Sequence, residues 1–327
     1  MHAIALIGAG RIGHIHAANV AAHPGLRLKH IVDRDPAAAT ALATVHGAIS
    51  SSLEAVLADP EVAGVIVASA TPSHVPLTLA AADAGKAVLC EKPFGGVRVA
   101  AEDAAARLEQ LGARVLIGFN RRFDPHFAGL QARLRAGEVG ALEALHIISH
   151  DPAPPPADYI AASGGLFLDM AIHDFDMARW LLGASPETVF ATGSCLVDPA
   201  IGAAGDIDTA RIVLRSADGR LCSISNSRRS GYGYDQRIEA YGAAGMLRVG
   251  NVAANRVERW DASGGHGATL QNFFLDRYAD AYRAQIDQFA AVLNGAAPAI
   301  TPHDAVAALA LAEAAARSAR SGSVERP

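Results

Sequence analysis

The chain has few cysteines and no long apolar run. Each of these absences excludes a class of protein or a kind of site. Its 3 cysteines among 327 residues are odd in number, widely spaced and without a metal-ligand pattern. No apolar run reaches the roughly 18 residues that a membrane-spanning helix needs. The sequence opens directly on a strand-like segment rather than on a signal peptide. We therefore expect a reduced, cytoplasmic protein with no membrane partner and no bound metal.

An excess of charge of one sign is also missing. The formal net charge is −5, from 28 basic and 33 acidic residues. This balance gives no electrostatic reason to expect nucleic acid or an anionic membrane as a partner. Hydrophobic residues make up 51% of the chain and charged residues 19%, which indicates a large soluble core. The length is that of about two domains.

What the sequence does contain is a glycine-rich turn between a predicted strand, residues 2–7, and a predicted helix, residues 15–22. The turn reads Gly8, Ala9, Gly10, Arg11, Ile12, Gly13. Gly8 permits the tight turn, Gly10 lets backbone amides approach a pyrophosphate, and Gly13 allows close packing of helix on strand. The phosphates would meet the positive end of the helix dipole. This context predicts a dinucleotide-binding turn rather than an ordinary glycine-rich loop.

A second predicted strand, residues 26–32, ends at Asp33, twenty residues after the last glycine of the turn. A carboxylate there can accept hydrogen bonds from a ribose 2′-hydroxyl and would repel a 2′-phosphate. The sequence therefore favours NAD over NADP. Arg34 weakens this inference, because its positive charge could partly offset the repulsion. The alternative interpretation of Asp33 is a surface aspartate.

Strand and helix continue to alternate up to residue 119. Strands are predicted over residues 62–69, 86–90 and 114–119, with a helix after His74 and another over 97–111. This alternation predicts a doubly wound parallel sheet with ligands at the carboxyl ends of its strands. Two loops at such ends supply further candidate cofactor contacts, namely Ser69, Thr71, Pro72 and His74 in the first and Glu91 and Lys92 in the second. His74 could equally be an ordinary helix-start residue, and Lys92 a solvated loop lysine.

The pattern changes from Asn120 onward. After a connecting helix over residues 124–135, strands are predicted over 141–149, 188–196, 209–214, 220–227, 236–242 and 246–249. Strands without helices between them predict a mostly antiparallel open sheet, with one face on helices and the other suited to an oligomer interface. We therefore expect a Rossmann domain over residues 1–120 and an α/β domain over 121–327. Closing helices over 274–294 and 303–320 are candidates for packing back on the first domain.

Residues 164–183 carry the clearest chemical signal. They are predicted to form one amphipathic helix, in which Asp169 and His173 are four residues apart and project from the same face. A carboxylate one turn from an imidazole can fix its tautomer and stabilise the imidazolium. Such a pair suits a histidine that must accept a proton. Taken alone, the pair could also be an ion pair on a helix surface.

Several motifs keep a fixed order along the chain: GAGRIG, TPSH, CEKPF, GFNRRFDP, GGLFLDMAIHDFDMARWLLG and FFLDRYADAYRAQIDQF. Together they resemble the glucose–fructose oxidoreductase/inositol dehydrogenase/MocA family, and most closely its inositol 2-dehydrogenase branch. The resemblance spans nearly the whole chain. It implies a Rossmann domain followed by an α/β domain with a large open sheet, commonly assembled into tetramers through that sheet. It also implies that Lys92, Asp169 and His173 match the family's catalytic trio.

The resemblance implies a substrate pocket as well, with Arg122 and Tyr234 as candidate contacts. Inositol dehydrogenases of the best-known type carry an Arg-Asn-Pro turn where this chain has His150-Asp151-Pro152. An ionised carboxylate can only accept hydrogen bonds, whereas an amide also donates them. Asp151 therefore leaves the implied reaction class in place but alters which ring hydroxyls are recognised.

The implied reaction is the NAD-dependent oxidation of a secondary hydroxyl of a cyclic polyol to a ketone, with myo-inositol to 2-keto-myo-inositol as the expected case. His173 would accept the hydroxyl proton, Asp169 would support it, and Lys92 would donate to the substrate oxygen. One alternative is a related dehydrogenase that acts on a pyranose sugar or on another inositol isomer. A second is a non-catalytic dinucleotide-binding regulator, which would be expected to lack the lysine or the histidine.

Overall fold

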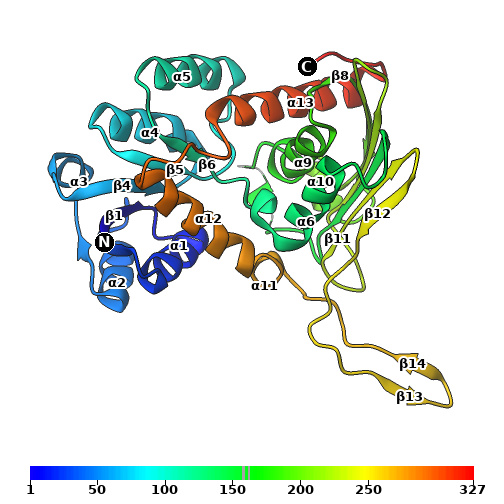
Figure 1. Ribbon diagram of the computed structural model, residues 1–327, viewed down its shortest axis with the longest axis horizontal. Helices are drawn as coiled ribbons and strands as arrows, with labels where there is room; N and C mark the ends of the chain where they lie inside the picture. Colours follow the sequence, from blue (N-terminus) through cyan, green and yellow to red (C-terminus); the bar gives the residue numbers. More distant parts are fainter. Residues whose placement is uncertain (157–158, 161–162) are drawn as a thin grey trace. The chain divides into compact units, whose positions relative to one another are not determined.

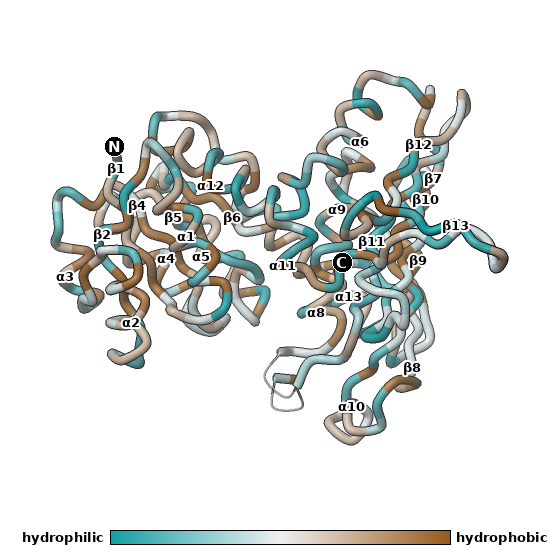
Figure 2. The backbone as a smooth tube through the Cα atoms, turned by 90° about the horizontal axis from the view of Figure 1, so that it is seen from below, coloured by the Kyte–Doolittle hydropathy of each residue, from teal (hydrophilic) through white to brown (hydrophobic). Residues whose placement is uncertain are grey.

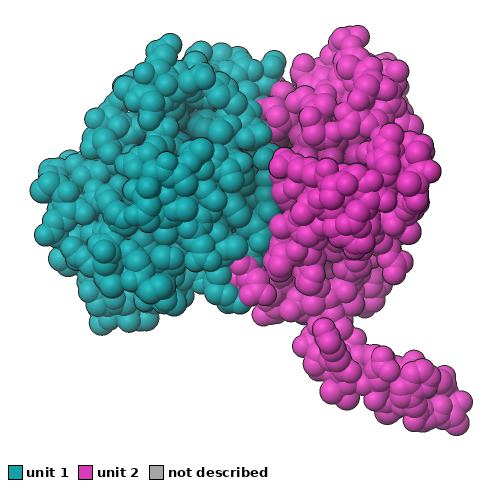
Figure 3. All heavy atoms as spheres, viewed as in Figure 1, with its two compact units in different colours: residues 1–123, 281–306 teal, residues 124–280, 307–327 magenta. Residues whose placement is uncertain are grey.

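The computed structural model describes residues 1–156, 159–160 and 163–327, and these divide into two compact units (Figures 1 and 3). The first unit comprises residues 1–123 and 281–306, and the second comprises 124–280 and 307–327. None of the helices in the described ranges combines the length and the apolar character needed to cross a bilayer.

A parallel sheet forms the centre of the first unit. Its strands are β1 (His2–Ile7), β2 (Leu26–Val32), β3 (Ile49–Ser50), β4 (Val62–Val67), β5 (Ala87–Cys90) and β6 (Val115–Ile117), in the order β3-β2-β1-β4-β5-β6. The connecting helices are α1 (Arg11–Ala22), α2 (Pro36–His46), α3 (Leu53–Ala58), α4 (His74–Asp83) and α5 (Arg98–Gln110). Every pairing in this sheet is parallel. The doubly wound sheet predicted from the sequence is confirmed, with its switch point between β1 and β4.

The central strands of this sheet are apolar on both faces, as expected for strands covered by helices on each side. Strand β1 is buried from Ala3 to Ile7, and Figure 2 shows hydrophobic residues along β1, β4 and β5. Gly64 in β4 makes room for α12 (Ala279–Leu293), because a Cβ there would lie 2.8 Å from Cζ of Phe289. A helix from late in the chain therefore packs on this sheet.

The second unit is built on another six-stranded sheet. Its strands are β7 (Leu142–His150), β8 (Pro186–Ser194), β9 (Thr209–Ser216), β10 (Leu221–Ser227), β11 (Asp235–Gly242) and β12 (Gly245–Val249), in the order β12-β11-β7-β10-β9-β8. Strands β7 and β10 pair in parallel, and the other four pairings are antiparallel. This confirms the mostly antiparallel open sheet that the sequence predicts.

The two faces of this sheet differ in burial. Every second side chain along the strands, such as Ile147 and Ile212, lies on a buried face, where β7 packs against α9 (Ile172–Leu182). The opposite face carries exposed apolar side chains, among them Phe190, Val213 and Tyr241. Each exposed residue alternates with a buried one, which is the period of a sheet covered by the chain on one face only.

The remaining helices and 3-10 turns lie between or after the strands of the two sheets. They are the 3-10 turns η1 (Thr71–Ser73) and η2 (Asn120–Phe123) and the helices α6 (Pro125–Arg135), α8 (Leu166–Asp169), α10 (Pro199–Ala203), α11 (Phe274–Arg277) and α13 (Pro302–Ser321). A hairpin of β13 (Arg259–Asp261) and β14 (Gly264–His266) extends away from the rest of the second unit (Figure 1). The helix predicted over 274–294 is divided into α11 and α12, because Tyr278 leaves the helical region at φ −112° and ψ 18°.

Two neighbouring glycines provide a test of this backbone geometry. Gly8 has φ +111°, and a Cβ there would lie 2.4 Å from the carbonyl oxygen of Ala68. Gly10 has φ −79° and ψ −169°, and apart from its own neighbours in the chain no described atom lies within 4 Å of its Cβ position. Gly8→Ala is therefore expected to lower the free energy of unfolding by more than about 1 kcal/mol, whereas Gly10→Ala leaves it equal or raises it by up to about 1 kcal/mol. Urea unfolding of the two variants measures this difference, and equal losses would contradict the geometry.

Candidate active site

The glycine turn lies at the carboxyl end of β1, next to the switch point of the parallel sheet. Gly13 packs so closely on the turn that a Cβ would lie 2.0 Å from the carbonyl oxygen of Gly8. At Gly10, by contrast, the Cβ position is open. Arg11 and Ile12 are the first two residues of α1, so their backbone amides have no acceptor within the helix. The turn therefore offers backbone donors and open space at a helix N-terminus, which is the arrangement that binds a pyrophosphate.

Asp33 lies beside this turn, directly after β2. Its Oδ2 accepts a hydrogen bond of 2.6 Å from the backbone amide of Ala9, and its Oδ1 accepts one of 2.9 Å from the amide of Asp35. These two bonds hold the carboxylate at the edge of the glycine turn. Arg34, the next residue, is exposed.

The two loops predicted to face the cofactor are tied together by His74. Its ring is buried, with Nδ1 2.8 Å from the carbonyl oxygen of Pro93 and Nε2 2.9 Å from that of Ser69. In the first loop, η1 contains Thr71 and Pro72, and the hydroxyls of Ser69 and Ser73 lie 2.7 Å apart. His74 therefore joins the ends of β4 and β5, and a direct cofactor contact by its ring stays a prediction.

Glu91 and Lys92 follow β5, but their side chains have different surroundings. Glu91 is buried, and its Oε1 lies 2.7 Å from Nε2 of His16 in α1. Tyr282 of α12 packs edge-on against the same imidazole, with ring centroids 5.9 Å apart. Lys92 is half-buried and precedes a cis peptide bond to Pro93. The buried glutamate–histidine contact thus fixes the strand exit from which the lysine projects.

The segment that carries Asp169 and His173 is not one continuous helix, which corrects the sequence-based expectation. Asp169 ends α8 and His173 is the second residue of α9. Met170 and Ala171, which separate the two helices, nevertheless keep right-handed helical dihedrals, at φ −99°, ψ −59° and φ −68°, ψ −16°. The interruption therefore changes the hydrogen-bonding pattern more than the path of the chain.

The carboxylate of Asp169 has two donors. The phenol of Tyr159 donates a hydrogen bond of 2.7 Å to Oδ1, and Nη1 of Arg228 lies 3.4 Å from Oδ2. Arg228 is buried and also lies 3.6 Å from a carboxylate oxygen of Asp206. A charged donor and a hydroxyl thus orient the carboxylate that the sequence assigns as the partner of His173.

Asp151 emerges next to Arg228 because β7 and β10 run parallel. The last pair in their register is His150 with Ser227, and the amide of Asp151 extends the ladder with a bond of 2.9 Å to the carbonyl of Ser227. Both strands therefore deliver the residue that follows them to the same edge of the sheet. Asp151 is half-buried at that edge.

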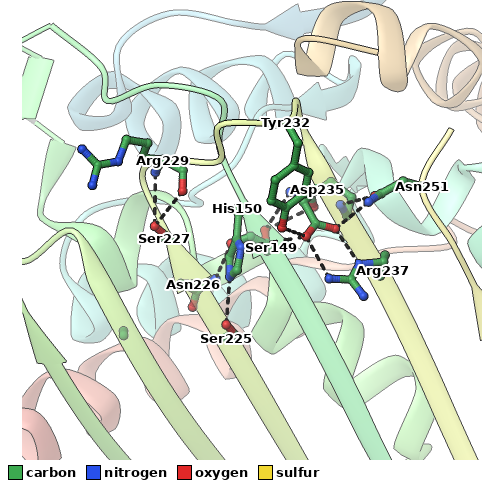
Figure 4. A network of polar contacts seen from close by, with 12 residues as sticks. Ser149, His150, Ser225, Asn226, Ser227, Arg229, Tyr232, Asp235, Arg237 and Asn251 are labelled. Atoms are coloured by element: carbon green, nitrogen blue, oxygen red, sulfur yellow. Dashed lines mark hydrogen bonds and ion pairs between the residues drawn. The ribbon is translucent and has the colours of Figure 1, made fainter. Parts of the chain in front are cut away.

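A polar network anchors the loop that follows β10 (Figure 4). At its centre, Asp235 accepts hydrogen bonds from Tyr232 (2.6 Å), Asn251 (2.7 Å) and both Nε and Nη2 of Arg237 (2.7 and 2.9 Å). Burial raises the pKa of Asp235, but the hydrogen bonds from Arg237, Tyr232 and Asn251 outweigh it and hold the pKa below its usual value. His150 lies alongside, 2.8 Å from the hydroxyl of Ser225, and burial lowers its pKa.

The two other predicted substrate contacts lie in different units. Tyr234, in the second unit, is buried and meets Tyr278 edge to face, with ring centroids 6.0 Å apart. Arg122, in the first unit, lies 3.3 Å from a carboxylate oxygen of Asp304. Lys92 and the predicted cofactor contacts also belong to the first unit, whereas Asp151, Asp169 and His173 belong to the second.

The sequence patterns missed three of the residues around Asp169, namely Tyr159, Asp206 and Arg228. The signals for them are weak: a double glycine at 164–165 before α8, and a pair of arginines at 228–229, just after β10. Within the described ranges, no group of three His, Cys, Asp or Glu side chains is arranged to hold a metal ion.

Comparisons with known proteins place these features in a family context. Residues 2–119 match the family described as an oxidoreductase family with an NAD-binding Rossmann fold, and residues 127–248 match the GFO/IDH/MocA C-terminal domain. The inositol 2-dehydrogenase of Rhizobium meliloti (strain 1021) is 44% identical over 317 residues, which is 96% of this chain and 95% of that protein.

Solved structures agree with this match. The myo-inositol dehydrogenase of Corynebacterium glutamicum has a TM-score of 0.96 at 42% identity, with 100% of this chain and 98% of that chain covered. The scyllo-inositol dehydrogenase of Lactobacillus casei, solved with NAD(H) and scyllo-inositol, has a TM-score of 0.92 at 26% identity, with coverage of 100% and 99%.

The polar network predicts how the stability of the protein depends on pH. Because the pKa of Asp235 is lowered on folding, this residue stabilises the fold above its unfolded pKa of about 3.9, and the contribution is lost as the pH falls further. Asp235→Asn is expected to lower the free energy of unfolding at pH 7 by about 1–3 kcal/mol. Below about pH 4 the difference from the wild type should shrink.

Urea unfolding at pH values from about 3.5 to 7 measures this difference. Asp103→Asn, at an exposed position of α5, is the control and should stay within about 0.5 kcal/mol of the wild type. A deficit for Asp235→Asn that is the same at all pH values would contradict the assignment.

Proposed function

Since this chain belongs to the GFO/IDH/MocA family of oxidoreductases, we propose that it is an inositol dehydrogenase that oxidises one ring hydroxyl to a ketone with NAD. The observation that carries the proposal is the similarity, over nearly the full chain, to proteins named inositol dehydrogenases. Both the dinucleotide-binding turn and the Asp169–His173 pair lie inside the matched length.

The cofactor is NAD, and the residues of the first unit fit it. The open position at Gly10 and the helix N-terminus that directly follows it suit a pyrophosphate. Asp33, held by the amide of Ala9, suits a ribose with two free hydroxyls. The loops that contain Ser69 and Lys92 meet through His74 at the same carboxyl edge of the sheet. When bound, the nicotinamide supplies the acceptor for the hydride.

His173 is the general base of the proposed reaction. It takes the proton of the reacting hydroxyl, so the electron pair left on oxygen can form the carbonyl as the carbon-bound hydrogen leaves. Asp169 stabilises the resulting imidazolium by its negative charge. Tyr159 and Arg228 keep that carboxylate oriented. The base thus begins the reaction with its supporting charge already in place.

Lys92 has the complementary role in the proposal. Its ammonium group donates to the oxygen of the reacting hydroxyl and stabilises the negative charge that develops there. Arg122, Asp151 and Tyr234 are proposed as contacts to the other ring hydroxyls. Arginine only donates hydrogen bonds, a carboxylate only accepts them, and a phenol does both, so together they can distinguish ring isomers.

We further propose that the protein is a homotetramer in the cytoplasm. The exposed apolar residues of the second sheet, including Phe190, Val213 and Tyr241, support a second copy of this chain as the partner of that face. The three free cysteines, Cys90, Cys195 and Cys222, are compatible with a reducing compartment.

A substrate panel tests the proposed activity. Purified protein with NAD is expected to produce NADH from at least one of myo-, scyllo- and chiro-inositol, and to be slower with common aldoses. His173→Ala should lower kcat by about 10²- to 10⁴-fold, because the base is lost, and should leave NAD binding nearly unchanged.

His126→Ala, at an exposed position of α6, is the control and should keep full activity. Turnover of aldoses alone would move the function to a sugar dehydrogenase. No turnover of any polyol or sugar would favour a non-catalytic regulator, and full activity of His173→Ala would refute the assigned base.

A further inference from the structure

Arg228 is the most completely buried cation near the proposed base. Its side chain is 1% exposed, whereas those of Asp169 and Asp206 are 14% and 15% exposed. A buried guanidinium is costly unless it is paired. Here Nη1 lies 3.4 Å from Oδ2 of Asp169, and Nη2 lies 3.6 Å from Oδ2 of Asp206. One cation therefore stands between two carboxylates.

The backbone fixes this arginine as firmly as its side chain does. The amide of Arg228 donates a hydrogen bond of 2.8 Å to the carbonyl oxygen of Asp208. The ladder between β7 and β10 ends at Ser227, the residue just before it. The backbone amide and the guanidinium of Arg228 are thus both bound to the segment of residues 206–208.

Asp206 is in turn held against the start of α8. Its Oδ1 accepts a hydrogen bond of 3.1 Å from the amide of Leu166. The close approach requires Gly165, which has φ +89° and whose Cβ would lie 3.0 Å from the same oxygen. The helix that ends at Asp169 is therefore attached to Asp206 at its beginning and to Arg228 at its end.

From this arrangement we infer that Arg228 and Asp206 are positioning residues for the reaction. Arg228 balances the charge of Asp169 and sets its orientation toward His173, and Asp206 holds the arginine in place. This inference rests on the proposed function, because it assigns Asp169 as the support of the base. Neither residue is proposed to touch the substrate or the cofactor.

Charge balance gives the inference a distinctive test. In R228Q two carboxylates remain without the cation between them and repel each other. In R228Q/D206N residue 206 is neutral, so no second negative charge repels Asp169. A residue that only fills space would show no such rescue.

We expect R228Q to lower kcat by about 10- to 100-fold, because a misplacement of about 1 Å in a catalytic group can cost about 100-fold in rate. R228Q/D206N should recover most of that loss. R228K should fall between the wild type and R228Q, because a lysine keeps the charge but lacks the fork that reaches both carboxylates. R229Q, the same substitution at the exposed neighbouring arginine, is the control and should keep full activity. The Kd for NAD should stay unchanged in all four proteins.

The inference is overturned if R228Q keeps full activity, or if R228Q/D206N is no more active than R228Q. Thermal unfolding supplies a readout that does not need activity: R228Q should lower Tm, and either D206N or D169N in the same background should raise it again. If R228Q does not fold, R228Q/D206N is expected to restore folded protein, and its failure to do so would contradict the inference. If the wild type turns over no polyol, the proposed function fails. The unfolding measurements would still show whether Arg228 balances the charges of Asp169 and Asp206.

Discussion

Parallel pairing of strands decides where the candidate site residues gather in each unit. In the first unit, β1, β2, β4 and β5 all run parallel, so the glycine turn, Asp33, Ser69 and Lys92 follow strands that end at one edge. The second sheet is mostly antiparallel, and β7 with β10 is the one parallel pair among its described strands. That pair brings Asp151 and Arg228 to one edge in the same way. In both sheets, although their topologies differ, residues that follow parallel strands are brought together at one edge.

Acidic side chains at these edges are held by donors within the chain. Asp33 is fixed by a backbone amide, Asp169 by a phenol and a guanidinium, and Asp235 by three side chains. Groups oriented before the substrate arrives need little rearrangement during the reaction. For Asp33 and Asp169, which the sequence assigns to the cofactor and to the base, these donors are a physical reason for the orientation of the carboxylate.

The sequence predicted the features that depend on neighbouring residues. Strands β1 and β2 have the predicted bounds. Strand β1 is a short apolar run ended by a glycine, and β2 begins with alternating apolar and polar residues and ends just before Asp33. Asp33 was found from its spacing to the turn. The break between α8 and α9 was missed because Met170 and Ala171 have ordinary side chains and nearly helical dihedrals.

Features that depend on distant residues could not be predicted. Arg228 is 59 positions from Asp169, and Asp206 is 40 positions from Leu166. Nothing local distinguishes the buried Arg228 from the exposed Arg229. Arg228 follows the last residue of the β7–β10 ladder, and its amide bonds to the carbonyl of Asp208. Both features belong to the folded sheet and leave no local signal in the sequence.

A crystal structure with NADH and myo-inositol would show directly whether this chain oxidises a ring hydroxyl with His173 as the base. We expect one ring hydroxyl within hydrogen-bond reach, about 2.6–3.2 Å, of both an imidazole nitrogen of His173 and Nζ of Lys92. A polyol bound with every hydroxyl beyond that reach of His173 would contradict it.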